Sequence, residues 1–151
     1  MANTQAMCTS FKGELLVGHH NFGTGVVRGS TATDSFKAAL YLASATVNAT
    51  TTAYSATGEV TGTNYTAGGV AVTFGTPPST SGTTAFVTPS ASITYSNVTL
   101  STAFDAVLIY NSTQSNKAVS VHSFGSQTVT AGAFSLTMPT NDSSTGLIRL
   151  A

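Results

Sequence analysis

Histidine, aspartate and serine, the side chains of a nucleophilic triad, occur together in "FDAVLIYNSTQSNKAVSVHSFG", residues 104–125. Asp105 and His122 are its candidate acid and base. A triad is defined by geometry rather than by inventory, however, and the chain has no G-x-S-x-G nucleophile elbow. A strand histidine and a carboxylate, each hydrogen-bonded locally, explain both residues without catalysis. We therefore expect no enzymatic activity and assign no catalytic residue.

A second candidate for chemistry is the adjacent pair His19–His20. Neighbouring side chains at a helix end point about 100° apart, which suits a shared metal poorly. A zinc site needs three or four converging ligands, and only His122, Cys8 and the few carboxylates remain to complete one. The glycines of "GTGVVRG" (23–29) follow a predicted helix and precede a predicted strand, the reverse of a dinucleotide fingerprint. We predict neither a metal nor a cofactor.

The low content of charged residues limits the classes of partner. Of 151 residues, 41% are hydrophobic, only 7% are charged, and five basic residues balance five acidic ones. A typical soluble domain has about 25% charged residues, and a nucleic-acid-binding surface needs a basic patch. The chain also lacks an apolar run of membrane-spanning length and the pattern of a signal peptide. We expect no nucleic acid and no membrane as partner, and a surface of Ser and Thr that favours association.

Periodicity predicts the elements that would position these residues. Met7, Phe11 and Leu15 recur at four-residue spacing, which predicts a short N-terminal helix, although Gly13 weakens it by about 1 kcal/mol. From residue 36 onward the pattern changes to short strands separated by Gly-, Pro- and Thr-rich turns. We therefore predict an N-terminal arm with a short helix (1–30), followed by one β-sandwich or jelly-roll domain (31–151).

The individual strands can be placed by their patterns. We expect strands at 36–43, 69–74, 83–88, 91–100 and 146–151, with a register change near Val98, a turn at 76–82 and a polar loop over 45–69. Residues 104–110 are apolar on both faces apart from Asp105, which indicates a strand buried on both sides. With the turn at 111–116 and the strand at 117–124 they form a predicted central hairpin, and two short strands follow around Ala131–Gly132.

Two tyrosines in the polar loop leave two interpretations open. Tyr54 and Tyr65 can form a stacking platform for a sugar, or they can anchor the loop to the sheet. The second interpretation is favoured, because tyrosine commonly packs its ring while its hydroxyl finds a partner.

Four blocks of the sequence carry a resemblance to a known group of proteins. The blocks are "TQAMCTSFKGELL", "DSFKAALYLASATVNATTTAYSATGEVTGTNYTAGG", "FDAVLIYNSTQSNKAVSVHSFG" and "TVTAGAFSLTMPTNDSSTGLIRLA". Together they resemble a small virion structural protein of tailed bacteriophages, over most of the chain except about 70–100. The resemblance implies a non-enzymatic subunit present in many copies, assembled in the bacterial cytoplasm into the virion. It implies no catalytic residue.

Within a particle, we favour a capsid decoration or cement protein on the outside of the head. Its expected partners are the major capsid protein or other virion subunits, and a homo-oligomer, with a trimer favoured, is expected through the strand faces and "GLIRLA". The contact residues that we expect are the helix stripe and the loop after it: Met7, Phe11, Leu15, His19, His20 and Phe22. The alternatives are a neck or tail component, such as an adaptor or fibre-attachment subunit, and a surface-displayed receptor- or glycan-binding module.

Overall fold

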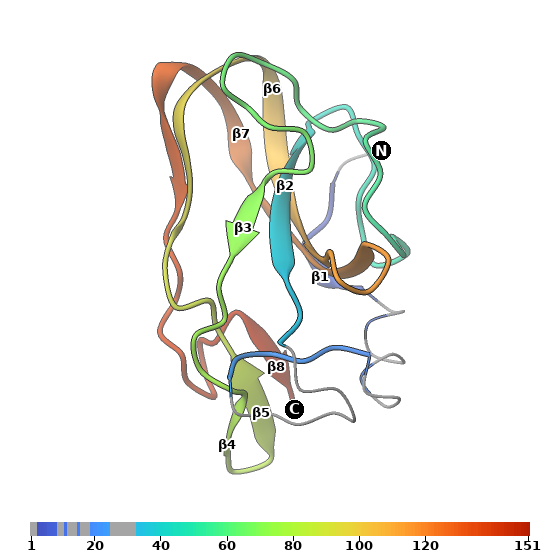
Figure 1. Cartoon of the computed structure of the whole chain (residues 1–151), viewed down its shortest axis with the longest axis vertical. Coiled ribbons are helices and arrows are strands. Elements are labelled where there is room, and N and C mark those ends of the chain that lie inside the picture. The colour runs from blue at the N-terminus through green and yellow to red at the C-terminus, as the bar shows by residue number, and fades with distance from the viewer. Residues whose placement is uncertain (1–2, 9–10, 12–14, 16–18, 25–32) are drawn as a thin grey trace.

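The computed structural model describes residues 3–8, 11, 15, 19–24 and 33–151, which form an all-β structure of two antiparallel sheets. The strands are β1 (Ala6–Met7), β2 (Phe36–Leu42), β3 (Val70–Val72), β4 (Ser79–Ser81), β5 (Thr84–Val87), β6 (Ile93–Asn111), β7 (Lys117–Leu136) and β8 (Ile148–Leu150). The larger sheet has the order β1-β7-β6-β2-β3 and the smaller one β4-β5-β8. Figure 1 shows the smaller sheet at one end of the molecule. The predicted all-β, sandwich-like class is confirmed.

The hairpin of β6 and β7 dominates the fold, with strands of 19 and 20 residues. Its pairing shifts register at several bulges, including one between Phe104 and Ala106. Because bulges bend a strand and increase its twist, the first half of β6 crosses over β2, where the Tyr95 hydroxyl donates a 2.8 Å hydrogen bond to the Ala38 carbonyl. The turn end of the hairpin therefore pairs beside β2, while Figure 1 shows its other end at the left of the molecule, beyond β3.

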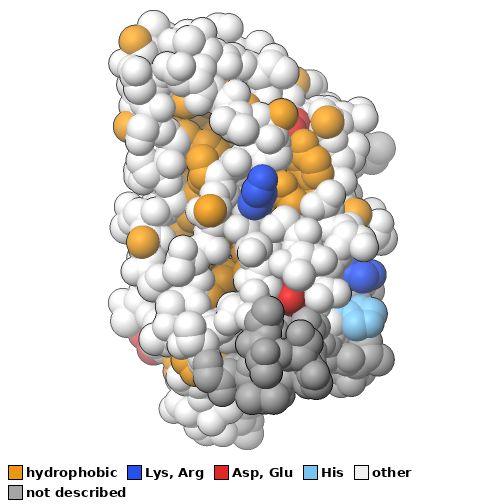
Figure 2. Space-filling view, in the orientation of Figure 1, with side chains coloured by type: hydrophobic (Ala, Val, Ile, Leu, Met, Phe, Trp, Pro, Cys, Tyr) orange, Lys and Arg blue, Asp and Glu red, His pale blue; other side chains and the backbone are white. Residues whose placement is uncertain are grey.

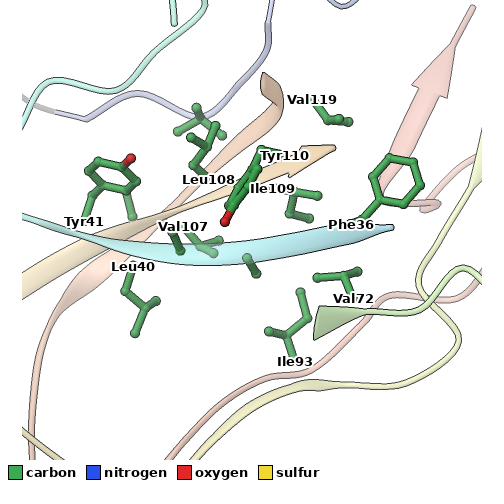
Figure 3. Packing of buried hydrophobic residues seen from close by; sticks show 14 of the residues in the cluster. Phe36, Leu40, Tyr41, Val72, Ile93, Val107, Leu108, Ile109, Tyr110 and Val119 are labelled. Atoms are coloured by element: carbon green, nitrogen blue, oxygen red, sulfur yellow. The ribbon is translucent and has the colours of Figure 1, made fainter. Parts of the chain in front are cut away.

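The core lies on both sides of the central strands, as the apolar run at 104–110 predicts. Leu40 and Tyr41 point to opposite sides of β2, and Ile93, from the start of β6, lies on the Leu40 side (Figure 3). Leu108 and Ile109 are 0% exposed. On the Tyr41 side, the ring of Tyr54 stacks on Tyr110 with centroids 4.8 Å apart. The start of β6 thus covers one face of β2, and the 45–68 segment lies on the other.

The predicted N-terminal helix is not seen as an element in the part of the chain that the structure describes. Met7 belongs to β1, which pairs with Ser120 and Val121 of β7. Phe11 and Leu15 have helical backbone, but the residues between and around them lie outside the described ones. The prediction was wrong for Met7 because apolar spacing along the chain does not indicate pairing with a distant strand. Ala6–Met7 pairs with the edge of β7, so Met7 is in a strand and not in a helix.

The strand predictions need two corrections. The segments 91–100 and 104–110 are one continuous strand, and so are 117–124 and the two short strands expected after it. At the points where the alternating pattern breaks, the strands contain bulges and not turns. One of these register shifts adjoins Val98, as predicted. The expected turn at 76–82 contains β4, which pairs with β5 across a turn at Gly82.

Candidate functional site

The two candidate catalytic residues engage separate partners. Nε2 of His122 lies 2.9 Å from the hydroxyl oxygen of Ser120, whereas the carboxylate of Asp105 accepts a hydrogen bond from the side-chain amide of Asn3. Within the described residues, no hydrogen bond joins Asp105 to His122. Ser120 is only 2% exposed, so its hydroxyl is out of reach of a substrate. The geometry lacks the oriented nucleophile–base–acid chain of a triad.

Burial of the His122 imidazole lowers its pKa to about 4. The ring is therefore neutral at physiological pH, because the apolar surroundings penalise its charged form. It lines a hollow of about 230 Å³ together with apolar residues that include Val107, Ile109 and Phe124. These contacts are those of a histidine packed in a sheet.

His19 and His20 have different environments. His19 is exposed, whereas His20 is 8% exposed. The His20 ring lies edge-on to Phe11 with centroids 4.7 Å apart, and its Nδ1 is 3.2 Å from the amide nitrogen of Asn111. Among the described residues, no group of three or more His, Cys, Asp or Glu is placed to hold a metal ion.

Glu59 is the centre of a buried polar cluster that the sequence reasoning did not select. Its carboxylate accepts hydrogen bonds from the Tyr54 hydroxyl at 2.7 Å, the Tyr65 hydroxyl at 2.8 Å and the backbone amide of Gly68 at 2.8 Å. Glu59 is 6% exposed. A buried carboxylate is tolerated only with such a set of donors. The sequence signal that could have indicated this cluster is the spacing of one acidic residue, Glu59, five positions after Tyr54 and six before Tyr65.

The same cluster decides between the two interpretations of the loop tyrosines. Tyr65 stacks on Tyr95 with ring centroids 5.9 Å apart and its hydroxyl accepts a hydrogen bond from the Leu40 amide. Burial, followed by the hydrogen bond to Glu59, raises the pKa of both Tyr54 and Tyr65. Both rings are stacked on other tyrosines and both hydroxyls are engaged, so they anchor the 45–68 segment to the larger sheet.

The six predicted contact residues are divided between the core and the surface. Phe11, His20 and Phe22 are 0%, 8% and 5% exposed and are packed in their own chain, which counts against a direct contact with a capsid. Met7 and Leu15 are half-buried. The helix stripe therefore does not offer a continuous exposed face, because Phe11 is used to close the monomer's core.

Three of these six residues, Phe11, Leu15 and Phe22, line an apolar hollow. We call this the end hollow; it has a volume of about 90 Å³ and is lined by Phe11, Leu15, Phe22, Pro78, Ala85, Phe86, Val87, Ile148 and Leu150. Its walls come from the arm and from the small sheet. Leu150 is 39% exposed and is the one exposed large hydrophobic side chain among the described residues. It belongs to "GLIRLA", which was predicted as a subunit interface.

Charge contributes little to the described surface. Figure 2 shows one face of the molecule on which uncharged side chains predominate and charged ones are few and scattered. Two of the described acids, Asp34 and Glu59, are buried, and Asp34 accepts a 2.8 Å hydrogen bond from the Asn111 amide. On the described residues, a partner would therefore meet hydroxyls, backbone and the apolar end hollow rather than an ionic surface.

No protein-family model, curated protein or solved structure matches this chain. In the described part of the chain, no helix has the length and apolar character needed to cross a bilayer.

Proposed function

We propose that this chain is a non-enzymatic structural subunit of a tailed-bacteriophage virion, and more specifically a decoration protein that binds the outside of the head and stabilises the shell. The major capsid protein is the proposed partner. The resemblance of the four sequence blocks supports the virion class. The chain is rich in Ser and Thr and has a formal net charge of +0. Because a net charge near zero favours association, this composition suits a subunit of an assembly.

The end hollow is the observation that supports this role best. Leu150 leaves apolar surface in water at its rim, and exposed apolar groups beside a pocket commonly mark a protein interface. The hollow holds Leu15, an expected contact residue that remains half-buried. We propose that an apolar side chain of the shell enters the end hollow, so that the contact lies between the arm and the small sheet.

A decoration protein stabilises a shell by binding the assembled lattice more tightly than free subunits, which follows from mass action. An uncharged contact surface fits this task, since it attracts no competing polyanions such as nucleic acid. The described histidines and carboxylates have local structural roles in this proposal.

The proposal is tested by adding the purified chain to particles that lack it. Leu150→Asp should weaken binding by at least about tenfold, because a carboxylate would have to be desolvated in the end hollow. Thr57→Asp is the matched control, since Thr57 is exposed in the loop before Glu59 and should leave binding unchanged. Equal binding of the two variants, with both folded by circular dichroism, would exclude the end hollow as the contact.

A further inference from the structure

The two halves of β7 differ in how their outer edge is covered. On the first half, Met7 and Ala6 pair with Ser120 and Val121, and the Cys8 amide donates to the Val119 carbonyl. The segment around Ala53 covers Lys117 and Ala118 in the same way. The chain thus satisfies this edge with its own backbone.

The second half of β7, residues 126–136, pairs with β6 on one side only. Within the described residues, no strand or bridge pairs with its other side. Figure 1 shows this part of β7 as the outermost ribbon of the molecule, on the side away from the residues drawn in grey. An unpaired edge presents backbone N–H and C=O groups that are ready to accept another strand.

This edge lacks most of the usual protection against pairing. The sequence from 126 to 136 is "SQTVTAGAFSL", which contains no charged residue and no proline. A bulge with Ala131 at φ 47° twists the strand near its middle, and leaves about five residues on each side. Among the described residues, the edge strands β1, β3, β4 and β8 are only two or three residues long. The outer side of β6 before Phe104 is engaged by Thr63 at Thr99 and by the Asn64 side chain at Asn97.

We propose that the free edge of β7, residues 126–136, is the dimerisation edge of this protein, where a second copy adds its own β7 antiparallel around a twofold axis. A second copy fits because an isologous contact needs only the one strand that both copies expose. An uncharged edge also meets itself without like-charge repulsion. The five residues on each side of the Ala131 bulge span about 17 Å each, which is the length of an ordinary strand.

The experiment uses the full chain with Cys8→Ser, so that the buried native thiol takes no part. Single cysteines placed in turn at each exposed position of residues 126–136 should give disulfide-linked dimers under mild oxidation at the position nearest the twofold axis, because only that residue faces its own copy. Thr57→Cys, an exposed position in the loop before Glu59, is the control and should give no more than background cross-linking. Cross-linking of all the edge variants at the level of this control would overturn the proposal.

A second measurement uses sedimentation of the native sequence and of Thr128→Lys/Ala133→Lys. Both positions are exposed, so the variant should fold, and its lysines would put like charges into the paired edge. The native chain should sediment as a dimer, and the variant should dissociate at least about tenfold more readily. A monomer at every concentration, a trimer, or a dimer indifferent to the lysines would refute the inference. A monomer that still binds particles would leave the proposed function standing.

Discussion

The hydroxyl of Tyr65 donates a 2.8 Å hydrogen bond to Oε1 of Glu59, and the carboxylate that receives it is only 6% exposed. Tyr54 donates to the other oxygen of the same carboxylate. One acid thus joins two aromatic rings that stack on tyrosines of β6. The bond is a structural anchor for a long polar segment, and its loss should be seen in stability.

Tyr65→Phe should lower the free energy of unfolding by about 1–3 kcal/mol, because it removes a donor from a buried carboxylate. Glu59→Ala should lower it further, since it leaves two hydroxyls and the Gly68 amide without their acceptor. Urea denaturation measures both effects. Thr57→Ala, in the same loop but exposed, is the control. A change below about 0.5 kcal/mol for both variants would contradict an anchoring role.

Stability should fall at high pH. Burial raises the pKa of Tyr41 to about 12 and also raises that of Tyr65 and Tyr95. Between the unfolded value of about 10 and the raised folded values, only the unfolded chain releases its phenolic protons. The stabilisation is therefore complete below pH 10 and is lost as the pH rises through 12. Denaturation midpoints at increasing pH, with phenolate absorbance, should show this; ionisation of all tyrosines near pH 10 in the folded protein would contradict it.

A fall in stability should also occur on the acid side because of His122. Its folded pKa of about 4 lies below the ordinary value of 6.5, so the unfolded chain takes up a proton first as the pH falls. The contribution is complete above pH 6.5 and is lost as the pH falls through 4. It amounts to on the order of 1–3 kcal/mol, after allowing for the ring's partial exposure.

His122→Gln should flatten this part of the pH profile of unfolding. His19→Gln, at an exposed position, is the control and should retain the native profile. Equal slopes for His122→Gln and the native chain between pH 4 and 6.5 would assign the acid sensitivity to other groups.

Gly69→Ala should be strongly destabilising. Gly69 has φ +74°, and a Cβ there would lie 1.6 Å from the carbonyl oxygen of Ala38 in β2. The left-handed backbone costs an alanine about 1 kcal/mol, and the collision with a central strand adds to it, so a loss of about 2–4 kcal/mol is expected. Gly125→Ala is the matched control, because its Cβ would meet nothing within 4 Å. Similar urea midpoints for the two variants would contradict the close approach of Gly69 to β2.

Binding to particles should depend little on salt. The proposed contact is apolar and the described charges are few, so screening has little to act on. Affinity measured between about 0.05 and 0.5 M salt should change by less than about threefold. A steep fall with salt would indicate an ionic contact elsewhere on the chain.

The central hairpin could be predicted from the sequence because its signals are local. The run from Phe104 to Tyr110 is apolar on both faces, and the polar stretch 111–116 separates it from an alternating strand. The structure places these residues in paired β6 and β7 around a turn at the expected point. The register change near Val98 was visible for the same reason.

Other features depend on contacts between distant parts of the chain. The four-residue spacing of Met7, Phe11 and Leu15 predicts a helix, yet Met7 pairs with Ser120 at the edge of β7. Phe11 was predicted as a capsid-contact residue in the helix stripe, yet it is fully buried in the core. The role of Glu59 depends on loop rings that stack on Tyr95 and Tyr110, both in β6. Periodicity within the loop cannot predict such distant contacts.

The most direct test of the proposed function is labelling of intact particles with an antibody against this chain, viewed by electron microscopy with band densities of the purified virion. The proposal predicts dense label over the head and an abundance that approaches that of the major capsid protein. Label confined to the neck or tail, or a low copy number, would contradict a decoration role and favour an adaptor or fibre-attachment subunit.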